Sequence, residues 1–235
     1  MRLDNLFVFP ELDSSNAYCK RNLASLCHMA IVQCYFQTDG QGRMDHIWHS
    51  QKGKDMLLSI VLKPCINIQH IQQLNQVVAV SLLDVLQSHN ISAMIKWPND
   101  IMVKDEKIAG ILIESCITDH LEGIIVGVGL NVNNEQYVSI SKCIDREISI
   151  EIIRDQFLQA FVRRYKQYEK GEYARLLQIA NTYSYLRDKW IGYKQEEVRF
   201  IELLDNGMLV VEKKEGNRHT LCINEVSLHQ KEGSL

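Results

Sequence analysis

The chain has 235 residues, of which 46% are apolar and 23% are charged, and its formal net charge is −3. This size and composition fit one large folded domain with at most one small one. No long block of one charge sign is present, so charge gives no general case for nucleic-acid or membrane binding. The amino terminus lacks an apolar signal segment, and no apolar run reaches the ~18 residues needed to cross a bilayer. We therefore expect a cytoplasmic protein.

Cysteine and histidine patterns give no disulfide or metal signal. The seven cysteines are an odd number and include no C-x-x-C pair, which argues against a disulfide framework and a zinc site. The eight histidines show no H-E-x-x-H or similar ligand spacing. We predict no metal-binding residues in the protein.

The first predicted elements are a short strand and a helix joined by a polar corner. Residues 7–9 form an apolar strand candidate, and residues 17–24 can form a helix. Between them lies Asp13-Ser14-Ser15-Asn16, whose short polar side chains can satisfy the free amides of the first helical turn. The hydroxyls of Ser14 and Ser15 can instead face a polar ligand, and the pattern leaves both interpretations open.

The second strand candidate, residues 29–36, leads into a loop that can bind an anion. Residues 37–48 contain Gly40 and Gly42 beside Arg43. Glycines let a backbone approach a ligand closely, and arginine offers a forked, permanently charged donor to carboxylate or phosphate. The loop lacks the third glycine of a dinucleotide-binding fingerprint and the G-K-[ST] of a P-loop. A flexible surface loop is the alternative interpretation.

The next two elements are expected to be scaffold. Residues 56–62 form an apolar strand candidate that stops at Pro64. Residues 68–87 carry apolar side chains at helical spacing, which predicts a helix buried against a sheet.

The strand candidates between residues 93 and 133 then carry polar groups at their ends. A strand at residues 93–97 ends at a Trp-Pro corner, residues 101–103 pair back to residues 108–114, and residues 126–133 form the next strand. Strands of one sheet bring such ends to a common rim. We predict that this rim is a binding site.

Lys96 is the main candidate residue of this rim. It lies directly before Trp97-Pro98, where packing can hold a lysine in place to neutralise an anionic ligand. A surface lysine that keeps its charge in water is the alternative. Gly110, Gly127 and Gly129 interrupt apolar strands, which favours a ligand pressed against the backbone.

The last third of the chain changes to helices and then to short strands. A helix that follows residue 148 is expected to bury one face, and residues 173–186 form a second helix. Strand candidates with a hairpin signal at Asn206-Gly207 follow. We predict two domains, residues 1–187 and a small β-barrel at residues 188–235. The buried helix face comprises Ile152, Ile153, Phe157, Phe161, Val162 and Tyr165.

These residues resemble the biotin protein ligases, which attach biotin to a lysine of biotin-dependent carboxylases. The most specific match is K-W-P-N-D at residues 96–100, followed by K-I-A-G-I-L-I-E at 107–114 and G-V-G-L-N-V-N at 127–133. Residues 13–16 resemble the biotin corner of the family, and residues 37–48 take the place of its Gly/Arg-rich loop. The resemblance covers nearly the whole chain. It implies an α+β fold in which helices flank a mixed sheet, as in class II aminoacyl-tRNA synthetases, plus a carboxy-terminal SH3-like barrel.

The resemblance also implies a two-step reaction. The biotin carboxylate attacks the α-phosphorus of Mg²⁺-bound ATP to give biotinyl-5′-AMP and pyrophosphate, and the lysine of a biotin carboxyl carrier protein domain then displaces AMP. Lys96 and Arg43 would be catalytic, because cations must lie between a carboxylate and a triphosphate that repel each other. Biotin would contact Ser14, Ser15, Gln37, Gly40, Gln41, Arg43, Lys96 and Gly110, and ATP would contact Arg43, Trp48, Lys96 and Asn131.

The Gly/Arg-rich loop departs from the family pattern. The family usually has G-R-G-[RQ]-[RN]-G-x-x-W, whereas this chain has G-Q-G-R-M-D-H-I-W at residues 40–48. Gln41 is tolerable if this position contributes its backbone, whereas ATP binding weakens if the arginine of the family neutralises phosphate there. Asp45 must point away from an anionic adenylate or meet a cation, because like charges repel. Asn224, where the family often has glycine, affects only a turn of the barrel.

Two other functions stay open. One is an acyltransferase of the same fold that handles lipoate or octanoate. Its site would need no hydroxyls that pair with the ureido ring of biotin, as those of Ser14 and Ser15 can. A catalytically weak module that binds biotin or its adenylate would account for Gln41 and Asp45. A homodimer through an exposed strand edge is also open.

Ligases that also act as repressors carry an amino-terminal helix-turn-helix domain. The strand candidate at residues 7–9 leaves no room for one. We therefore expect a monofunctional ligase without sequence-specific DNA binding. A gel shift that shows specific retention of an operator fragment would contradict this expectation.

Overall fold

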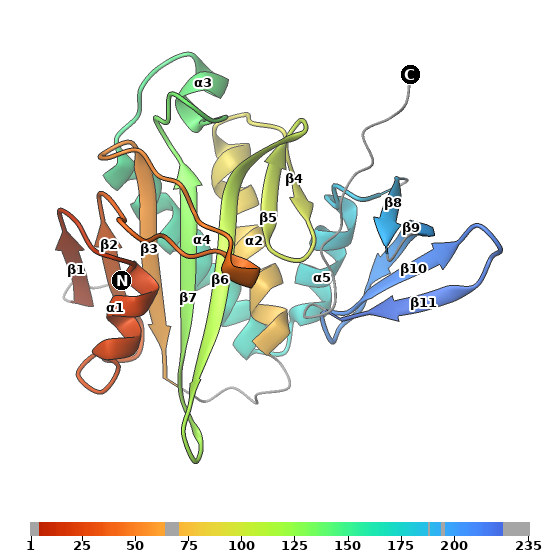
Figure 1. Ribbon diagram of the computed structural model, residues 1–235, viewed down its shortest axis with the longest axis horizontal. Helices are drawn as coiled ribbons and strands as arrows, with labels where there is room; N and C mark the ends of the chain where they lie inside the picture. The colour runs from red at the N-terminus through yellow and green to blue at the C-terminus, as the bar shows by residue number, and fades with distance from the viewer. Residues whose placement is uncertain (1–4, 64–70, 188, 194–195, 223–235) are drawn as a thin grey trace.

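The computed structural model describes residues 5–63, 71–187, 189–193 and 196–222. It has the predicted α+β fold, with a seven-stranded mixed sheet flanked by helices and a separate four-stranded antiparallel sheet that follows it in the chain (Figure 1). None of the helices in these ranges is long and apolar enough to cross a membrane.

The large sheet has the strand order β1-β2-β3-β7-β6-β5-β4. Strands β1 and β2 are parallel, and the other neighbouring pairs are antiparallel. The two longest strands, β6 and β7, therefore lie side by side near the middle of the sheet. The bounds are β1 (Leu6–Phe9), β2 (Ala30–Cys34), β3 (Asp55–Leu62), β4 (Ala93–Lys96), β5 (Asp100–Val103), β6 (Glu106–Ile117) and β7 (Leu121–Asn131).

Helices cover both faces of this sheet. Helices α2 (Ile71–Ser88) and α4 (Ile150–Glu169) pack on each other and on one face, and α1 (Ser15–Arg21) packs on β2, β3 and β7 at the opposite face (Figure 1). Because side chains alternate along a strand, β3 supplies Leu58 to the main core and Val61 to a smaller core under α1. The face that carries α1 is the one on which the candidate site lies.

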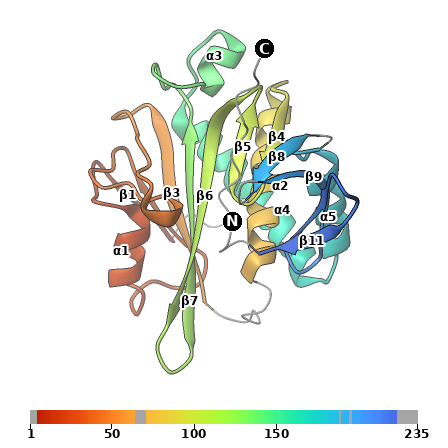
Figure 2. The ribbon, with the colours of Figure 1, turned by 45° about the vertical axis from the view of Figure 1, so that its right-hand side comes forward.

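The four-stranded sheet has the order β11-β10-β9-β8. Figure 2 shows it beside α5 (Tyr173–Thr182). Its strands are β8 (Trp190–Tyr193), β9 (Glu196–Leu203), β10 (Leu209–Lys213) and β11 (Arg218–Leu221). The rest of the predicted barrel, including Asn224, lies outside the described residues.

Most predicted elements are confirmed, but helix α5 is shorter than expected. It ends at Thr182, because the chain that follows pairs with the edge of β4. The amide of Ile95 donates to the carbonyl of Tyr183, and the carbonyl of Ile95 accepts from the amide of Tyr185, both at 2.8 Å. The short helix α3 (Ile140–Ile144) and the 3₁₀ turn at Arg43–Asp45 were not predicted.

The predicted position of Ile152 on the buried face of α4 is wrong. Its side chain is 52% exposed, whereas Ile153 and Phe157 are fully buried. Successive residues of an α-helix are turned by about 100°. The stripe that passes through Ile153 and Phe157 therefore leaves Ile152 on the solvent side.

Candidate functional site

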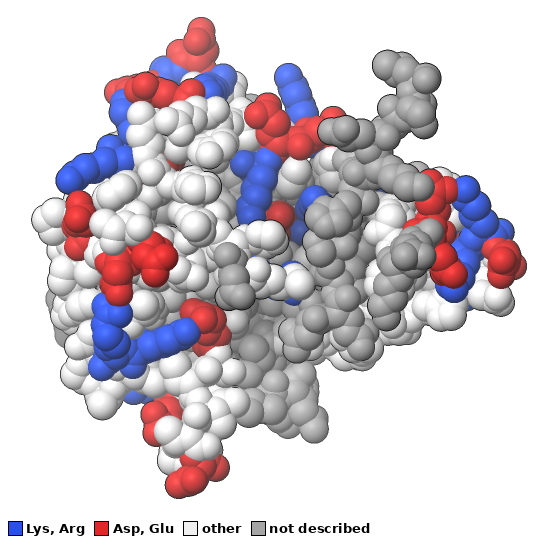
Figure 3. Space-filling view, viewed as in Figure 1, with Lys and Arg blue, Asp and Glu red and all other residues white. Residues whose placement is uncertain are grey.

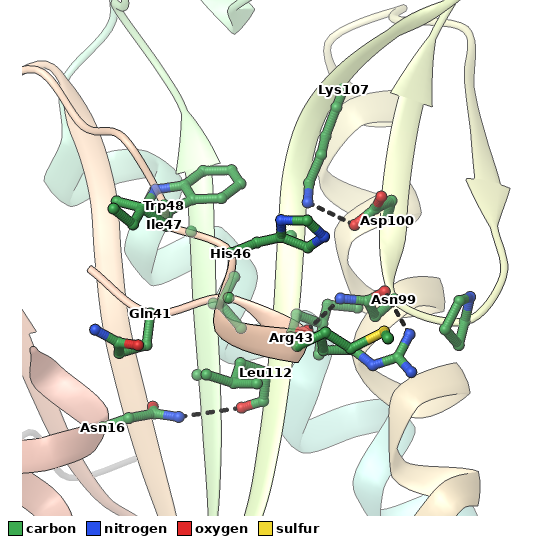
Figure 4. A pocket seen from close by; sticks show the side chains of 18 of the residues that line it. Asn16, Gln41, Arg43, His46, Ile47, Trp48, Asn99, Asp100, Lys107 and Leu112 are labelled. Carbon is green, nitrogen blue, oxygen red and sulfur yellow. Dashed lines mark hydrogen bonds and ion pairs between the residues drawn. The ribbon is translucent and has the colours of Figure 1, made fainter. Parts of the chain in front are cut away.

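A pocket of about 230 Å³ opens on the sheet face that carries α1. Its walls come from the start of α1, the loop that precedes β3, the corner between β4 and β5, and the central strands β6 and β7 (Figure 4). The corner between β4 and β5 and the strands β6 and β7 were expected to share a rim, and the start of α1 and the loop join them here. The lining comprises Ser14, Ser15, Asn16, Gln37, Gln41, Gly42, Arg43, Met44, His46, Ile47, Trp48, Lys96, Trp97, Pro98, Asn99, Asp100, Lys107, Gly110, Ile111, Leu112, Gly127, Val128 and Gly129.

One end of the pocket is polar and uncharged. The backbone amide and the hydroxyl of Ser15 donate to Oε1 of Gln37 at 2.8 and 3.0 Å. This fixes the orientation of the Gln37 amide, since the Ser15 amide needs an acceptor, and it leaves Nε2 of Gln37 as a donor for a ligand. Ser14 is the N-cap of α1, and its Oγ accepts from the amide of Ala17 at 3.4 Å.

Asn16 and Ser59 support this polar end from beneath. The Ser59 hydroxyl donates to Oδ1 of Asn16 at 2.6 Å and lies 2.8 Å from Oγ of Ser15. Nδ2 of Asn16 donates to the carbonyl of Leu112 at 3.2 Å and to Oε2 of Glu114 at 2.8 Å. Ser59 and Asn16 are both buried, so this network fixes the position of Ser15 without solvent.

The opposite side of the pocket is cationic (Figure 4). Arg43 donates to Oδ1 of Asn99 at 3.4 Å, and Asn99 is held in turn by a bond from its Nδ2 to the carbonyl of Ile111 at 2.9 Å. Burial lowers the pKa of the Arg43 guanidinium, and the carboxylate of Asp100 opposes this shift. An arginine stays charged at neutral pH even so.

Lys96 and Lys107 add two more cations to this side. Lys96 is half-buried at the end of β4 and lines the pocket, with no ion pair or side-chain hydrogen bond to the described part of the chain. Lys107 forms an ion pair with Asp100 at 2.7 Å. Its Nζ also lies 5.2 Å from the centre of the Trp48 ring. Of these two lysines, Lys96 is therefore the one that a ligand can reach without first breaking an ion pair to a described residue.

The Trp48 ring covers two of the glycines that were expected to face a ligand. A Cβ on Gly129 would lie 2.5 Å from Cε2 of Trp48, and one on Gly110 would lie 2.9 Å from Cζ3. Gly127 is covered by Asn16, since a Cβ there would lie 2.4 Å from Oδ1 of Asn16. These glycines make room for protein side chains that shape the pocket.

The structure brings most of the predicted site residues together, with two exceptions. Gly40 does not line the pocket but closes the loop, because its carbonyl accepts from the amide of Trp48 at 2.8 Å. Asn131 is also absent from the lining and is 97% buried, with its Nδ2 bound to the carbonyl of Val138 at 2.9 Å. Gln41 lines the pocket, and Nε2 of its side chain donates to Oδ1 of Asp39 at 2.7 Å. The side chain of Asp45 is outside the described part of the structure.

Asn16, Asn99, Asp100 and Lys107 lie within the motifs that resemble the family, but no individual role in the site was predicted for them, and Ser59 was not singled out. One signal was present, because Ser59 is a lone hydroxyl within the apolar strand β3. For the others the sequence shows ordinary polar residues at turns and strand ends. Their roles depend on the contacts described above.

Beyond the pocket, Asp55 and Asn131 face each other across β3 and β7. Oδ2 of Asp55 accepts from the amide of Gln51 and from Nδ2 of Asn134, both at 2.8 Å. Oδ1 of Asp55 and Oδ1 of Asn131 are buried and have no hydrogen-bond partner among the residues described. Burial raises the pKa of the Asp55 carboxyl, although the hydrogen bonds to this carboxyl lower it.

Asp55→Asn is expected to raise the free energy of unfolding by about 1 kcal/mol at neutral pH. The new amide removes a buried charge and offers a donor on the side of Asn131. The gain should shrink in acid. The raised native pKa of Asp55 stabilises the wild type below the unfolded pKa of about 3.9, and this stabilisation is lost as the pH rises through the native pKa. Urea unfolding across this pH range tests the prediction. A gain that is independent of pH, or a loss at neutral pH, would contradict it.

The described residues on the surface around the pocket form no broad patch of one charge. Figure 3 shows lysine and arginine side chains close to aspartate and glutamate on this face. Several of these neighbours are ion pairs, such as Lys20 with Glu114 at 2.5 Å and Arg21 with Asp13 at 2.6 Å. The positive groups that a ligand meets are therefore those inside the pocket.

Several known proteins have sequences similar to that of this chain. The chain is 33% identical over 144 residues to the bifunctional ligase/repressor BirA of Bacillus subtilis, which covers 56% of this chain and 44% of the relative. It is 32% identical over 124 residues to the biotin--[acetyl-CoA-carboxylase] ligase of Paracoccus denitrificans, with 51% of each chain covered. The chain thus spans about half of the length of these relatives.

Solved structures show the same fold. A biotin protein ligase from Aquifex aeolicus in complex with biotin and ATP aligns with a TM-score of 0.86 at 20% identity, over 97% of this chain and 100% of that one. The biotin acetyl coenzyme A carboxylase synthetase from Helicobacter pylori with bound biotinylated ATP aligns with a TM-score of 0.62 at 22% identity, over 92% and 98%. A family model matches residues 8–131, more than half of the chain. This chain belongs to the biotin/lipoate A/B protein ligase family.

Proposed function

We propose that this protein is a biotin protein ligase, which activates biotin as biotinyl-5′-AMP and transfers it to a lysine of a biotin carboxyl carrier protein domain. The observation that supports this most is the order of groups along the pocket. Neutral hydrogen-bonding groups at Ser15 and Gln37 are followed by an apolar wall and then by the cations Arg43 and Lys96. Biotin has the same order, with a ureido ring, an apolar body and a carboxylate.

In this proposal the uncharged end of the pocket binds the ureido ring. Gln37 offers Nε2 as a donor, and the hydroxyls of Ser14 and Ser15 line the same end. The backbone of Gln41 faces the ring from the loop. Leu112 and Val128 cover the apolar part of the ligand. Lipoate and octanoate offer no group that can pair with this set of donors and acceptors, which favours biotin as the substrate.

The cations support the first chemical step. A carboxylate oxygen of biotin forms a bond to the α-phosphorus of ATP, the bond from that phosphorus to the bridging oxygen breaks, and pyrophosphate leaves. Lys96 and Arg43 line the side of the pocket where these anions would meet, and they lower the barrier through charge and position. In the second step the amine of the carrier lysine attacks the acyl carbon, and AMP leaves with the bonding electrons.

The adenylate is proposed to lie beside Trp48, whose ring spans Gly110 and Gly129. Mg²⁺ would enter with the triphosphate and screen the phosphate oxygens. A magnesium ion of this kind keeps several waters and needs only one or two protein carboxylates. Among the described residues Asp100 is the acidic side chain that lines the pocket, and no cluster of three or more potential metal ligands is present. Asp100 therefore fits the requirement, provided that Lys107 releases it.

Biotin-dependent exchange of pyrophosphate into ATP tests the proposed activity. We expect exchange with biotin and none with lipoate. Exchange with lipoate alone would support the acyltransferase alternative, and tight biotin binding without exchange would support a binding module. Transfer to a carrier domain, and the division into a catalytic unit at residues 1–187 and a second unit at residues 188–235, are parts of the same proposal.

Ser59→Ala is expected to weaken biotin binding by about 5-fold, which is about 1 kcal/mol. The change leaves Oδ1 of Asn16 without its donor and loosens the support under Ser15. Calorimetric titration with biotin measures the effect. Ser81→Ala is the matched control, since Ser81 is also fully buried but donates to the carbonyl of Val77 within α2. Equal affinities for the two variants would contradict the role of Ser59.

A further inference from the structure

We infer that the turn between β9 and β10 positions Lys96, so that the second sheet is needed for the rate of adenylation as well as for stability. The link is the indole of Trp97, which is next to Lys96 in the chain and is 4% exposed. Its Nε1 donates to the carbonyl of Gly207 at 3.1 Å. This inference rests on the proposed function of Lys96.

The turn that accepts this hydrogen bond is held tightly against α2. Gly207 has a φ of +81°, and a Cβ on it would lie 2.8 Å from Cβ of Gln72. The neighbouring carbonyl of Asp205 accepts from Nε2 of Gln73 at 2.6 Å. The side chain of Asn181 on α5 also binds both the amide and the carbonyl of Leu203, at 2.8 and 3.0 Å. The turn is thus a fixed point for the Trp97 indole.

The other side of Lys96 is held by a different segment, which follows α5 and precedes the second sheet. The backbone of Ile95 makes two hydrogen bonds to Tyr183 and Tyr185, in the segment that leads from α5 toward β8. Residues on both sides of Lys96 are therefore fixed by groups outside the large sheet. The Lys96 side chain has no ion pair or hydrogen bond of its own within the described residues, so its direction depends on this backbone.

Two variants break the link from opposite sides. Trp97→Phe removes the indole N–H but keeps an aromatic ring, and Gly207→Ala pushes the turn away from Gln72. Each is expected to lower kcat for biotin-dependent pyrophosphate exchange by about 10-fold, because small misplacements of a catalytic group are costly. The Kd for biotin alone should change much less than kcat, because the groups that bind the ureido ring, Ser15 and Gln37, do not depend on this turn. Gly216→Ala is the matched control, since Gly216 has a φ of +87° in the same sheet but no heavy atom within 4 Å of its Cβ position.

A combined variant separates positioning from a loss of stability. If Trp97 acts through Lys96, adding Trp97→Phe to Lys96→Ala should cause no further loss of kcat. A further 10-fold loss in the combined variant, or an unchanged kcat in both single variants, would overturn the inference.

Hydrogen exchange gives a test that does not need activity. Amides of residues 93–99 should exchange faster in Gly207→Ala than in the wild type, and at the wild-type rate in Gly216→Ala. Unchanged exchange in Gly207→Ala would overturn the coupling. If amide exchange at residues 93–99 is faster in Gly207→Ala but the wild type shows no biotin-dependent exchange of pyrophosphate, the coupling stands and the proposed function is refuted.

Discussion

Replacing Lys96 with alanine is expected to lower the rate of biotin adenylation by about 100-fold, or about 3 kcal/mol of transition-state stabilisation. The carboxylate of biotin and the triphosphate of ATP repel each other, and Lys96 lines the pocket without an ion pair to any described residue. Arg43→Ala is expected to have a similar effect, since Arg43 lines the same side. Pyrophosphate exchange at saturating biotin and ATP measures both rates.

The melting temperature of Lys96→Ala should stay close to that of the wild type. Its side chain is half-buried and forms no ion pair with the described residues, so truncation removes little packing. Lys166→Ala is a suitable control, because Lys166 is an exposed lysine on α4, away from the pocket. If Lys96→Ala unfolds or keeps full exchange activity, its assigned role is wrong.

Gly127→Ala is expected to damage biotin binding and stability together. The new Cβ would lie 2.4 Å from Oδ1 and 2.9 Å from Cγ of Asn16, so the Asn16 side chain must move. That movement breaks its hydrogen bonds with Ser59 and Glu114. We expect a loss of about 2 kcal/mol in the free energy of unfolding and at least a 10-fold increase in the Kd for biotin, about 1.4 kcal/mol. Urea unfolding and calorimetry measure the two effects.

Gly123→Ala tests whether the effect on biotin is specific. Gly123 lies on the same strand, and a Cβ there would lie 2.9 Å from the flexible end of Leu23, away from the pocket. This variant should lose some stability and keep its affinity for biotin. Equal losses of affinity in Gly123→Ala and Gly127→Ala would mean that any methyl group added to β7 weakens biotin binding. The loss in Gly127→Ala could then not be assigned to the movement of Asn16.

The sequence predicted the strands and the site rim because both depend on local pattern. Alternation and turn residues locate β3 and β6 within a few residues, whereas β7 begins at Leu121 instead of the predicted residue 126. The corner between β4 and β5 lines the pocket as predicted, but β7 lines it with mid-strand residues and not with its polar end at Asn131. The exposed position of Ile152 was missed, because neighbouring isoleucines look alike in sequence and only packing decides which of them is buried.

Contacts across the sheet could not be predicted in the same way. Ser59 and Asn16 are 43 residues apart in the chain, and their hydrogen bond depends on how α1 sits over β3 and β7. Similarly, the fit of the Trp48 ring over Gly129 requires the register between β3 and β7 and the path of the loop. The bond from Trp97 to Gly207 spans 110 residues and joins two sheets.

The most direct test of the whole account is to incubate the protein with biotin and Mg²⁺-ATP and to identify the bound product by mass spectrometry. We predict biotinyl-5′-AMP from the wild type and a strongly reduced amount from Lys96→Ala. If the wild type instead holds biotin and intact ATP without any adenylate, the proposal that this pocket joins biotin to the AMP part of ATP is contradicted.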